Sequence, residues 1–243
     1  LANYIDGLVS LGGAYWDTMK SSTSFVGVGI QGITVPLRDG MTVPTNNNFV
    51  AGDLSQTTGL LSDGSTKYLA TGLTGSDLLQ NDHSFSVYAS SATSSGFAGG
   101  IFGDGFVNPI AIAVGPTTTN FYSSAPVDAS AKVTSAPSLV GLSRSVNTEF
   151  TARTNQGDET FTRTTLAPLN TGGLSLFAVG AGVAPTVARL ATYHAGPALD
   201  LATLEGLQDT LLSEIAGVGL SAQAITFNGQ PFFFNGNNLT YNG

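Results

Sequence analysis

The sequence contains no cysteine, only two histidines and few charged residues. Without cysteine the chain forms neither disulfides nor thiolate metal sites, and two scattered histidines disfavour a transition-metal centre. Charged residues make up 10% of the 243 residues, whereas roughly 25% is usual in soluble domains. Serine, threonine, glycine and alanine fill the gap. Such a surface is typical of extracellular adhesins, virion proteins and repetitive assemblies, and it is unfavourable for a lone cytosolic monomer.

Positive charge is especially scarce. Eight Lys and Arg residues stand against sixteen Asp and Glu residues, so the formal net charge is −8. Nucleic acids and anionic membranes both require a basic surface, so we expect neither as a partner. No apolar run of about 18 residues is present, so no membrane-spanning helix is expected. The lack of disulfides is expected of a protein that folds in a bacterial cytosol and functions elsewhere, and the start at Leu1 is expected of a processed or incomplete product.

What the sequence does contain is a series of strand patterns between about residues 60 and 195. Phe85 and Val87 alternate with serines, and Phe150 and Ala152 alternate with polar residues. This period of two predicts half-buried antiparallel strands with the apolar residues facing inward. Hairpin loops are expected at 103–105 and 155–158. Evenly spaced strands predict an all-β sandwich or jelly roll, with strands at 68–71, 84–90, 97–102, 110–114, 139–143, 150–154, 160–164, 174–179 and 187–193.

One segment near residues 200–216 follows a helical period instead. Its leucines and one isoleucine recur every three or four residues and form an apolar stripe from Leu201 to Ile215. Asp200 precedes the stripe as an N-cap, and Gly217 follows it as a stop. We predict a helix that packs on one sheet.

The N-terminal segment, residues 1–54, is expected to cover or anchor the sandwich. Tyr4, Ile5 and Leu8 recur at helical spacing, and residues 21–60 are rich in loop formers, with short strands conceivable at 25–28 and 33–35. Trp16, the only tryptophan, is expected to anchor this segment on the main body. The alternative for Trp16 is a ligand-stacking role.

The C-terminal tail, residues 221–243, repeats an aromatic-Asn-Gly pattern every seven residues, at Phe227, Phe234 and Tyr241. Asn-Gly is the strongest short-range hairpin signal, and five residues between successive pairs are enough for one strand. The tail therefore predicts a small β-meander. Because so small a sheet is not stable alone in water, Phe227, Phe232, Phe233, Phe234 and Tyr241 are expected to pack on the body of the chain or on a neighbouring copy.

Several strand segments and the helix that follows them resemble a known family. They are residues 63–72 (DGSTKYLATG), the strand after Asp82-His83, residues 139–144 (LVGLSR) with the hairpin at 149–164, and residues 174–180 (LSLFAVG) followed by 187–196 (VARLATYHAG). Together they resemble concanavalin A-like, laminin-G-like sandwiches, in the versions found in tailed-bacteriophage structural proteins. The resemblance covers about residues 55–217, and an Asn-Gly-rich C-terminal tail also occurs in the phage versions.

The resemblance implies a jelly-roll sandwich at 55–220 that binds carbohydrate, a cell surface or another virion protein more often than it catalyses a reaction. Many members hold Ca²⁺ through Asp and Asn at one sandwich edge. Here Asp104, Asn108 and Asp128 are isolated in the sequence, so no acidic cluster supports a Ca²⁺ site and we expect no cofactor.

Catalysis has no supporting set of residues in the sequence. Hydrolases that resemble this sandwich carry the pattern Glu-x-Asp-x-x-Glu on one strand, and the four glutamates of this chain do not form it. A Ser-His-Asp triad would require His83 or His194, and both are expected to be hydrogen-bonded or solvated. We therefore expect no enzyme.

The expected function is that of a non-enzymatic bacteriophage virion protein, a capsid-decoration or tail-fibre component that assembles through its termini as a homotrimer with itself and with other virion proteins. The alternative is a glycan-binding receptor or adhesion module. Arg144, Arg153 and Arg163 lie on predicted strands. They are expected to form surface charge pairs or, alternatively, a surface that faces a saccharide or a partner.

Overall fold

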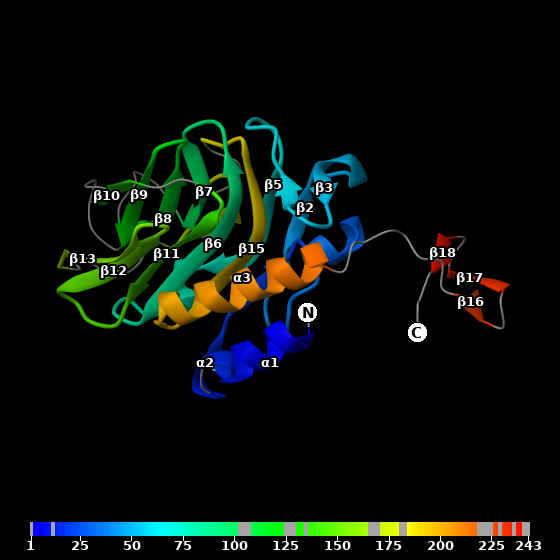
Figure 1. Cartoon of the computed structure of the whole chain (residues 1–243). Coiled ribbons are helices and arrows are strands. Elements are labelled where there is room, and N and C mark those ends of the chain that lie inside the picture. Colours follow the sequence, from blue (N-terminus) through cyan, green and yellow to red (C-terminus); the bar gives the residue numbers. More distant parts are fainter. Residues whose placement is uncertain are drawn as a thin grey trace.

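The computed structural model describes residues 2–10, 13–101, 108–123, 130–133, 136–164, 171–179 and 184–217, and three strands at 226–227, 230–234 and 237–239. Two antiparallel sheets face each other, and helices α1 (Ala2–Ser10) and α3 (Leu201–Gly217) lie on the outer side of one of them (Figure 1). The expected all-β sandwich is thus confirmed. Among the described helices, none is long and apolar enough to cross a membrane.

The sheet that carries the helices has the strand order β13-β12-β11-β6-β15-β4-β3, and β1 also pairs with β15. We call it the helix-side sheet. Its members are β1 (Ser21–Ser24), β3 (Leu54–Ser55), β4 (Gly59–Leu61), β6 (His83–Ala92), β11 (Ser138–Arg144), β12 (Glu149–Thr154), β13 (Gly157–Thr162) and β15 (Ala188–Gly196).

The second sheet has the order β10-β9-β8-β7-β14-β5-β2. Its members are β2 (Thr45–Asn47), β5 (Tyr68–Thr74), β7 (Gly96–Ile101), β8 (Ile110–Val114), β9 (Thr118–Ser123), β10 (Ser130–Val133) and β14 (Gly173–Leu176). Short 3-10 helices η1 (Ile30–Thr34), η2 (Ala51–Asp53) and η3 (Gly75–Asp77) lie in the connections.

The main hydrophobic core fills the space between the two sheets. Phe85 and Val87 of β6 and Phe150 and Ala152 of β12 all belong to it, and each is at most 2% exposed. The inward direction predicted from their alternation is therefore confirmed. Burial of each large apolar side chain stabilises the fold by about 2 kcal/mol.

The outer side of β6 is also covered, although the strand is expected to be only half-buried. Ser84 and Ser86 are fully buried, because α3 and the segment before it lie over this part of the helix-side sheet. Ser84 Oγ donates a hydrogen bond of 2.6 Å to the carbonyl oxygen of Pro197. The small serine side chains let the covering chain approach closely.

Helix α3 forms where the leucine stripe predicted it. Leu204 and Leu211 are fully buried and pack with residues of the sheet's outer side in a second core. Asp200 Oδ1 accepts hydrogen bonds from the amides of Ala202 and Thr203, which is the predicted N-cap. At Gly141, below the start of α3, an added Cβ atom would lie 2.9 Å from Leu201 Cδ2 and 3.0 Å from Ser86 Cβ, so a larger residue would force these side chains to shift.

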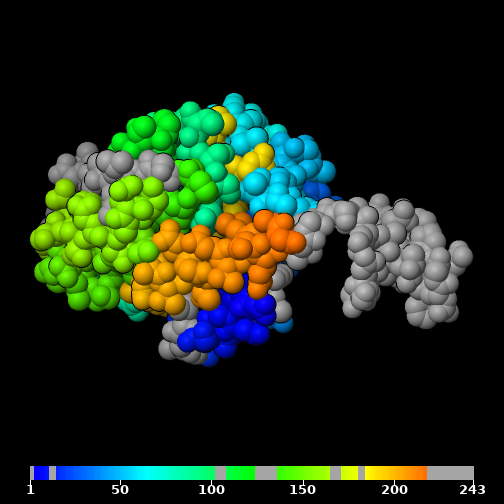
Figure 2. Space-filling model, in the orientation of Figure 1, coloured from blue at the N-terminus to red at the C-terminus, as the bar shows by residue number. Residues whose placement is uncertain are grey.

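The N-terminal segment supplies more than a cover. Helix α1 packs on α3, and α2 (Gly13–Thr18) follows it. In the space-filling view α3 (orange) lies between α1 (dark blue) and the yellow-green β12–β13 hairpin (Figure 2). Residues 21–24, which are expected to be a loop, form the fully buried strand β1, and residues 30–34 form η1 rather than a strand.

Two predicted turns and the tail can be compared with the structure. β12 and β13 pair antiparallel from Glu149↔Thr162 to Thr154↔Gly157, which confirms the hairpin, and Gly157 has a φ of 87°. The loop at 103–105 lies outside the described residues.

In the tail, β16 (Thr226–Phe227), β17 (Gln230–Phe234) and β18 (Asn237–Leu239) form a three-stranded antiparallel sheet, as the Asn-Gly repeat predicts.

Candidate functional site

Arg144 lies neither in a surface charge pair nor on a ligand-facing surface, the two alternatives that the sequence left open. It is fully buried at the end of β11. Its Nε donates to Ser123 Oγ and its Nη2 to the carbonyl oxygen of Ser123, both at 2.9 Å, and Nη1 donates to the carbonyl oxygen of Arg163 at 2.9 Å. The guanidinium also lies 5.4 Å from the centre of the Phe150 ring. Burial lowers the pKa of Arg144 to about 10, and the residue connects the two sheets.

Arg153 lies at the surface and holds the β12–β13 hairpin against α3. Its Nε donates to Glu205 Oε2 at 2.6 Å, and its Nη1 donates to Asp158 Oδ1 at 2.8 Å. Arg163, just after β13, is partly exposed, and its amide donates to the carbonyl oxygen of Thr148. The structure therefore separates the three arginines into one buried residue and two surface residues.

A depression beside Arg153 is the feature that the sequence did not reveal. It has a volume of about 440 Å³ and lies between the β12–β13 hairpin and the start of α3. We call it the hairpin depression. Its polar lining comes from Ser143, Ser145, Thr151, Asp158 and Asp200, and its apolar lining from Ala198, Leu199 and Leu201.

The electrostatics of the hairpin depression are acidic. Hydrogen bonds from the Thr203 hydroxyl and amide and from the Ala202 amide, together with the nearby Arg153, lower the pKa of Asp200. This carboxylate is therefore ionised at neutral pH. The Asp158 side chain, which forms part of the wall of the depression, is exposed, and its ion pair with Arg153 fixes its position.

A second depression, of about 460 Å³, lies at the adjacent end of the helix-side sheet. We call it the rim depression. It is lined by Thr18, Lys20, Ser76, Asp77, Leu78, Leu79, Asp82, Gly196 and Pro197. The amide and hydroxyl of Thr74 both donate to Asp77 Oδ2 at 2.8 Å and, with Lys20, lower the pKa of Asp77. Leu79 is 67% exposed and offers an apolar surface beside these polar groups.

The two histidines are buried and hydrogen-bonded. His194 Nδ1 lies 2.8 Å from Ser22 Oγ, and its Nε2 lies 2.6 Å from the Tyr4 hydroxyl. His83 Nδ1 lies 2.9 Å from the carbonyl oxygen of Leu79 and Nε2 3.1 Å from Ser123 Oγ. Burial lowers the pKa of His194 to about 3 and that of His83 to about 4. The Ser22–His194 pair cannot serve as nucleophile and base here, because neither residue reaches solvent.

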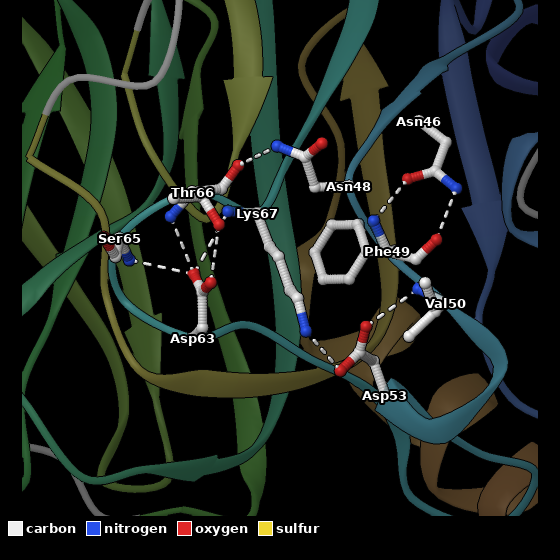
Figure 3. Close-up of polar contacts among 9 residues, drawn as sticks. All are labelled: Asn46, Asn48, Phe49, Val50, Asp53, Asp63, Ser65, Thr66 and Lys67. Atoms are coloured by element: carbon white, nitrogen blue, oxygen red, sulfur yellow. Dashed lines mark hydrogen bonds and ion pairs between the residues drawn. The ribbon is translucent and has the colours of Figure 1, made fainter.

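Two loops rich in Asp and Asn provide a test for the Ca²⁺ that the family resemblance implies (Figure 3). The Asp63 carboxylate accepts hydrogen bonds from the amides of Ser65, Thr66 and Lys67 and from the Thr66 hydroxyl, at 2.7 to 3.1 Å. Burial raises the pKa of Asp63, but these four donors outweigh it, so the pKa lies well below its usual value.

The neighbouring carboxylate of Asp53 is also saturated. Lys67 Nζ lies 2.6 Å from Asp53 Oδ1, and the Val50 amide donates to Asp53 Oδ2 at 2.8 Å (Figure 3). A Ca²⁺ ion would have to displace these donors, so the loops do not fit it. Within the described ranges no three His, Cys, Asp or Glu side chains gather. Of the residues singled out in the sequence, Asn108 is 4% exposed, and Asp104 and Asp128 lie outside the described residues.

The aromatic residues expected to mediate assembly lie in different parts of the structure. Trp16 is partly buried and packs on the hydrophobic clusters around α1, α2 and α3, so it anchors the N-terminal segment within the chain. Phe227, Phe232, Phe233 and Phe234 lie on β16 and β17. Tyr241 lies outside the described residues.

No protein-family model and no curated protein matches this sequence. Solved structures do match it. The botulinum neurotoxin serotype D binding domain superposes with a TM-score of 0.54 at 7% identity, covering 86% of this chain and 54% of that one. The binding domain of Paraclostridial Mosquitocidal Protein 1 superposes with a TM-score of 0.50 at 12% identity, covering 90% of this chain and 56% of that one.

A third match is to domains LG4-5 of the mouse laminin alpha1 chain, with a TM-score of 0.36 and 8% identity over 46% of this chain and 33% of that one. This chain therefore spans one third to about half of the length of the three structures. Identities this low show a shared fold alone. The two binding domains and the observed strand order support a jelly-roll β-sandwich fold of the concanavalin A-like type for this chain.

Proposed function

We propose that this chain is a non-catalytic glycan-binding domain whose ligand lies in the hairpin depression. The observation that carries the proposal is the lining of that depression, which combines the polar side chains of Ser145, Thr151 and Asp158 with the apolar side chains of Ala198 and Leu199. Sugars present hydroxyl groups at the ring edge and C–H groups on the ring face. A concave site whose lining combines placed polar groups with apolar side chains complements both.

Arg153 supports the proposal because it preorganises the site. Its two ion pairs attach Asp158 of the hairpin and Glu205 of α3 to one guanidinium. A wall held in this way loses little conformational freedom when a sugar binds, which favours affinity. Arg153 is not itself part of the lining, but it forms an ion pair with Asp158, which is.

The fold adds general support. The two structures with TM-scores of 0.50 and 0.54 are both described as binding domains, one of a botulinum neurotoxin and the other of a mosquitocidal protein. Sandwiches of this architecture therefore serve recognition in those proteins, and the same use is proposed here.

A glycan array probed with the full chain tests the proposal. We expect binding to a subset of glycans, and we expect Thr151→Trp, which fills the hairpin depression, to abolish it. Ser213→Trp is the matched control, because Ser213 is exposed on α3 away from both depressions. Circular dichroism checks that both variants fold. Silence of the unmodified chain across the array, or unchanged binding by folded Thr151→Trp, would refute the assignment.

A second candidate function is that of a structural component of a bacteriophage virion. The observation that favours it is the three-stranded sheet β16–β18, which is separate in its strand pairing from both sandwich sheets. A sheet of this size requires a packing partner. We propose that the tail joins copies of this chain into a homotrimer and attaches them to other virion proteins, which leaves the sandwich free to bind glycan.

Deletion of residues 221–243 tests the second candidate. Native mass spectrometry should show a trimer for the full chain and a monomer for the truncated one, with the same thermal unfolding midpoint for the sandwich. A truncated chain that assembles as the full chain does would contradict the role of the tail. Labelling of intact phage particles with an antibody against the sandwich tests the location, and unlabelled particles would contradict it.

A further inference from the structure

The hairpin depression and the rim depression border the same short segment, Pro197–Leu199. Pro197 lines the rim depression, and Ala198 and Leu199 line the hairpin depression. Three residues of extended chain span about 10 Å at most. The two depressions are therefore neighbours that meet at this short segment, which we call the 197–199 ridge.

The 197–199 ridge is fixed from both sides by residues of the depressions themselves. Asp82, in the rim depression, accepts a hydrogen bond of 2.8 Å from the Ala198 amide through Oδ1. Ser143, in the hairpin depression, accepts one of 3.0 Å from the Leu199 amide through Oγ. Ser84 Oγ donates to the Pro197 carbonyl oxygen below them. The consecutive amides of Ala198 and Leu199 are thus each bound by a side chain that lines a different depression, and this keeps the two depressions at a constant separation.

We infer that the two depressions form one extended site for a linear, uncharged oligosaccharide that crosses the 197–199 ridge. This inference rests on the proposed function of the hairpin depression and adds a second half to its site. Each depression is within the size range of small-molecule sites, and the ridge between them is narrow enough for a few linked sugar rings to cross. The exposed Leu79 gives the rim half an apolar surface for a ring face.

The charge of the lining selects against acidic glycans. Asp77 and Asp82 line the rim depression, and Asp158 and Asp200 line the hairpin depression. Among the described lining residues, Lys20 is the one cation, and Arg153 beside the hairpin depression is already paired with two carboxylates. A glycan with uronic or sialic acid residues would be repelled by these carboxylates and by the net charge of −8.

Calorimetric titration with oligosaccharides of increasing length tests the inference. The probes are glucose oligomers with α-1,4 or β-1,4 linkages and N-acetylglucosamine oligomers, each from the disaccharide to the hexasaccharide, with oligogalacturonate as the acidic probe. We expect at least one neutral series to bind, with affinity that rises about tenfold or more along the series once both halves are filled. Oligogalacturonate is expected not to bind.

Two variants, each of which fills one depression with a tryptophan side chain, distinguish failure of the extended site from failure of the hairpin depression. Ser76→Trp in the rim depression should reduce the hexasaccharide affinity to that of the disaccharide, and Ser213→Trp should leave the whole series unchanged. If folded Ser76→Trp binds the hexasaccharide as tightly as the unmodified chain does, the extended site is wrong, while loss of binding in Thr151→Trp still supports the hairpin depression. Preferential binding of oligogalacturonate would overturn the selectivity, and absence of binding in all neutral series would overturn the extended site, whereas the glycan array decides whether the hairpin depression binds glycan at all.

Discussion

The Nε2 atom of His194 lies 2.6 Å from the hydroxyl oxygen of Tyr4 and so joins the first helix to the central strand β15. On its other side, His194 Nδ1 lies 2.8 Å from Ser22 Oγ of β1. All three side chains are at most 2% exposed. Because a buried polar group without a partner is costly, this row of hydrogen bonds determines where the N-terminal segment can dock.

Tyr4→Phe tests that row directly. The change removes the hydroxyl group and leaves a ring nitrogen of His194 buried without its partner, so we expect the free energy of unfolding to fall by about 1–3 kcal/mol. Urea denaturation provides the measurement. Tyr68→Phe, at a partly exposed position of β5, is the matched control and should have little effect. Equal stability of the two variants would contradict the structural role of the Tyr4–His194 contact.

The pH dependence of stability follows from the two buried histidines. Burial lowers the pKa of His83 to about 4 and of His194 to about 3, from 6.5. As the pH falls below 6.5 the unfolded chain binds protons that the folded chain does not, so stability is complete above this pH and is lost toward acid. At pH 5 the loss amounts to about 2 kcal/mol for each histidine. Denaturant unfolding at pH 7 and pH 5 measures it, and an unchanged free energy would refute the buried neutral state.

Arg144 and Arg153 should behave differently when each is replaced by methionine. Arg144→Met removes the donors to Ser123 and to the Arg163 carbonyl, and we expect a loss of about 3 kcal/mol or more. Arg153→Met breaks two ion pairs near the surface, which are worth about 1 kcal/mol together. Guanidinium denaturation ranks the two variants. The reverse ranking would show that Arg144 is not a structural residue.

Calcium should not stabilise the described sandwich. The carboxylates of Asp53 and Asp63 are already occupied by Lys67, backbone amides and a threonine hydroxyl. A ligand that binds only the folded state raises its stability by mass action, so the midpoint of thermal unfolding should be the same with added Ca²⁺ and with a chelator. A higher midpoint in Ca²⁺ alone would contradict the saturated state of these loops.

Local periodicity in the sequence was sufficient to predict several strands and one helix. The alternation of Phe85 and Val87 is enforced by the two-residue repeat of a strand, and the stripe between Leu201 and Ile215 by the 3.6-residue repeat of a helix. Both patterns depend on neighbours in the sequence and were predicted correctly. β1 was missed, because Ser21–Ser24 has no apolar alternation and its burial depends on pairing with β15.

By itself, then, the sequence determined the sandwich class, most of its strands, the helix after Asp200 and the small sheet of the tail. Only the tertiary structure decided that Arg144 is buried and that the 197–199 ridge lies between two depressions. The ridge is held by Asp82 and Ser143, which are 116 and 56 residues from their partners. Backbone periodicity is a short-range property, whereas the partner of a buried polar group is chosen by how distant segments pack, and that choice leaves no local pattern.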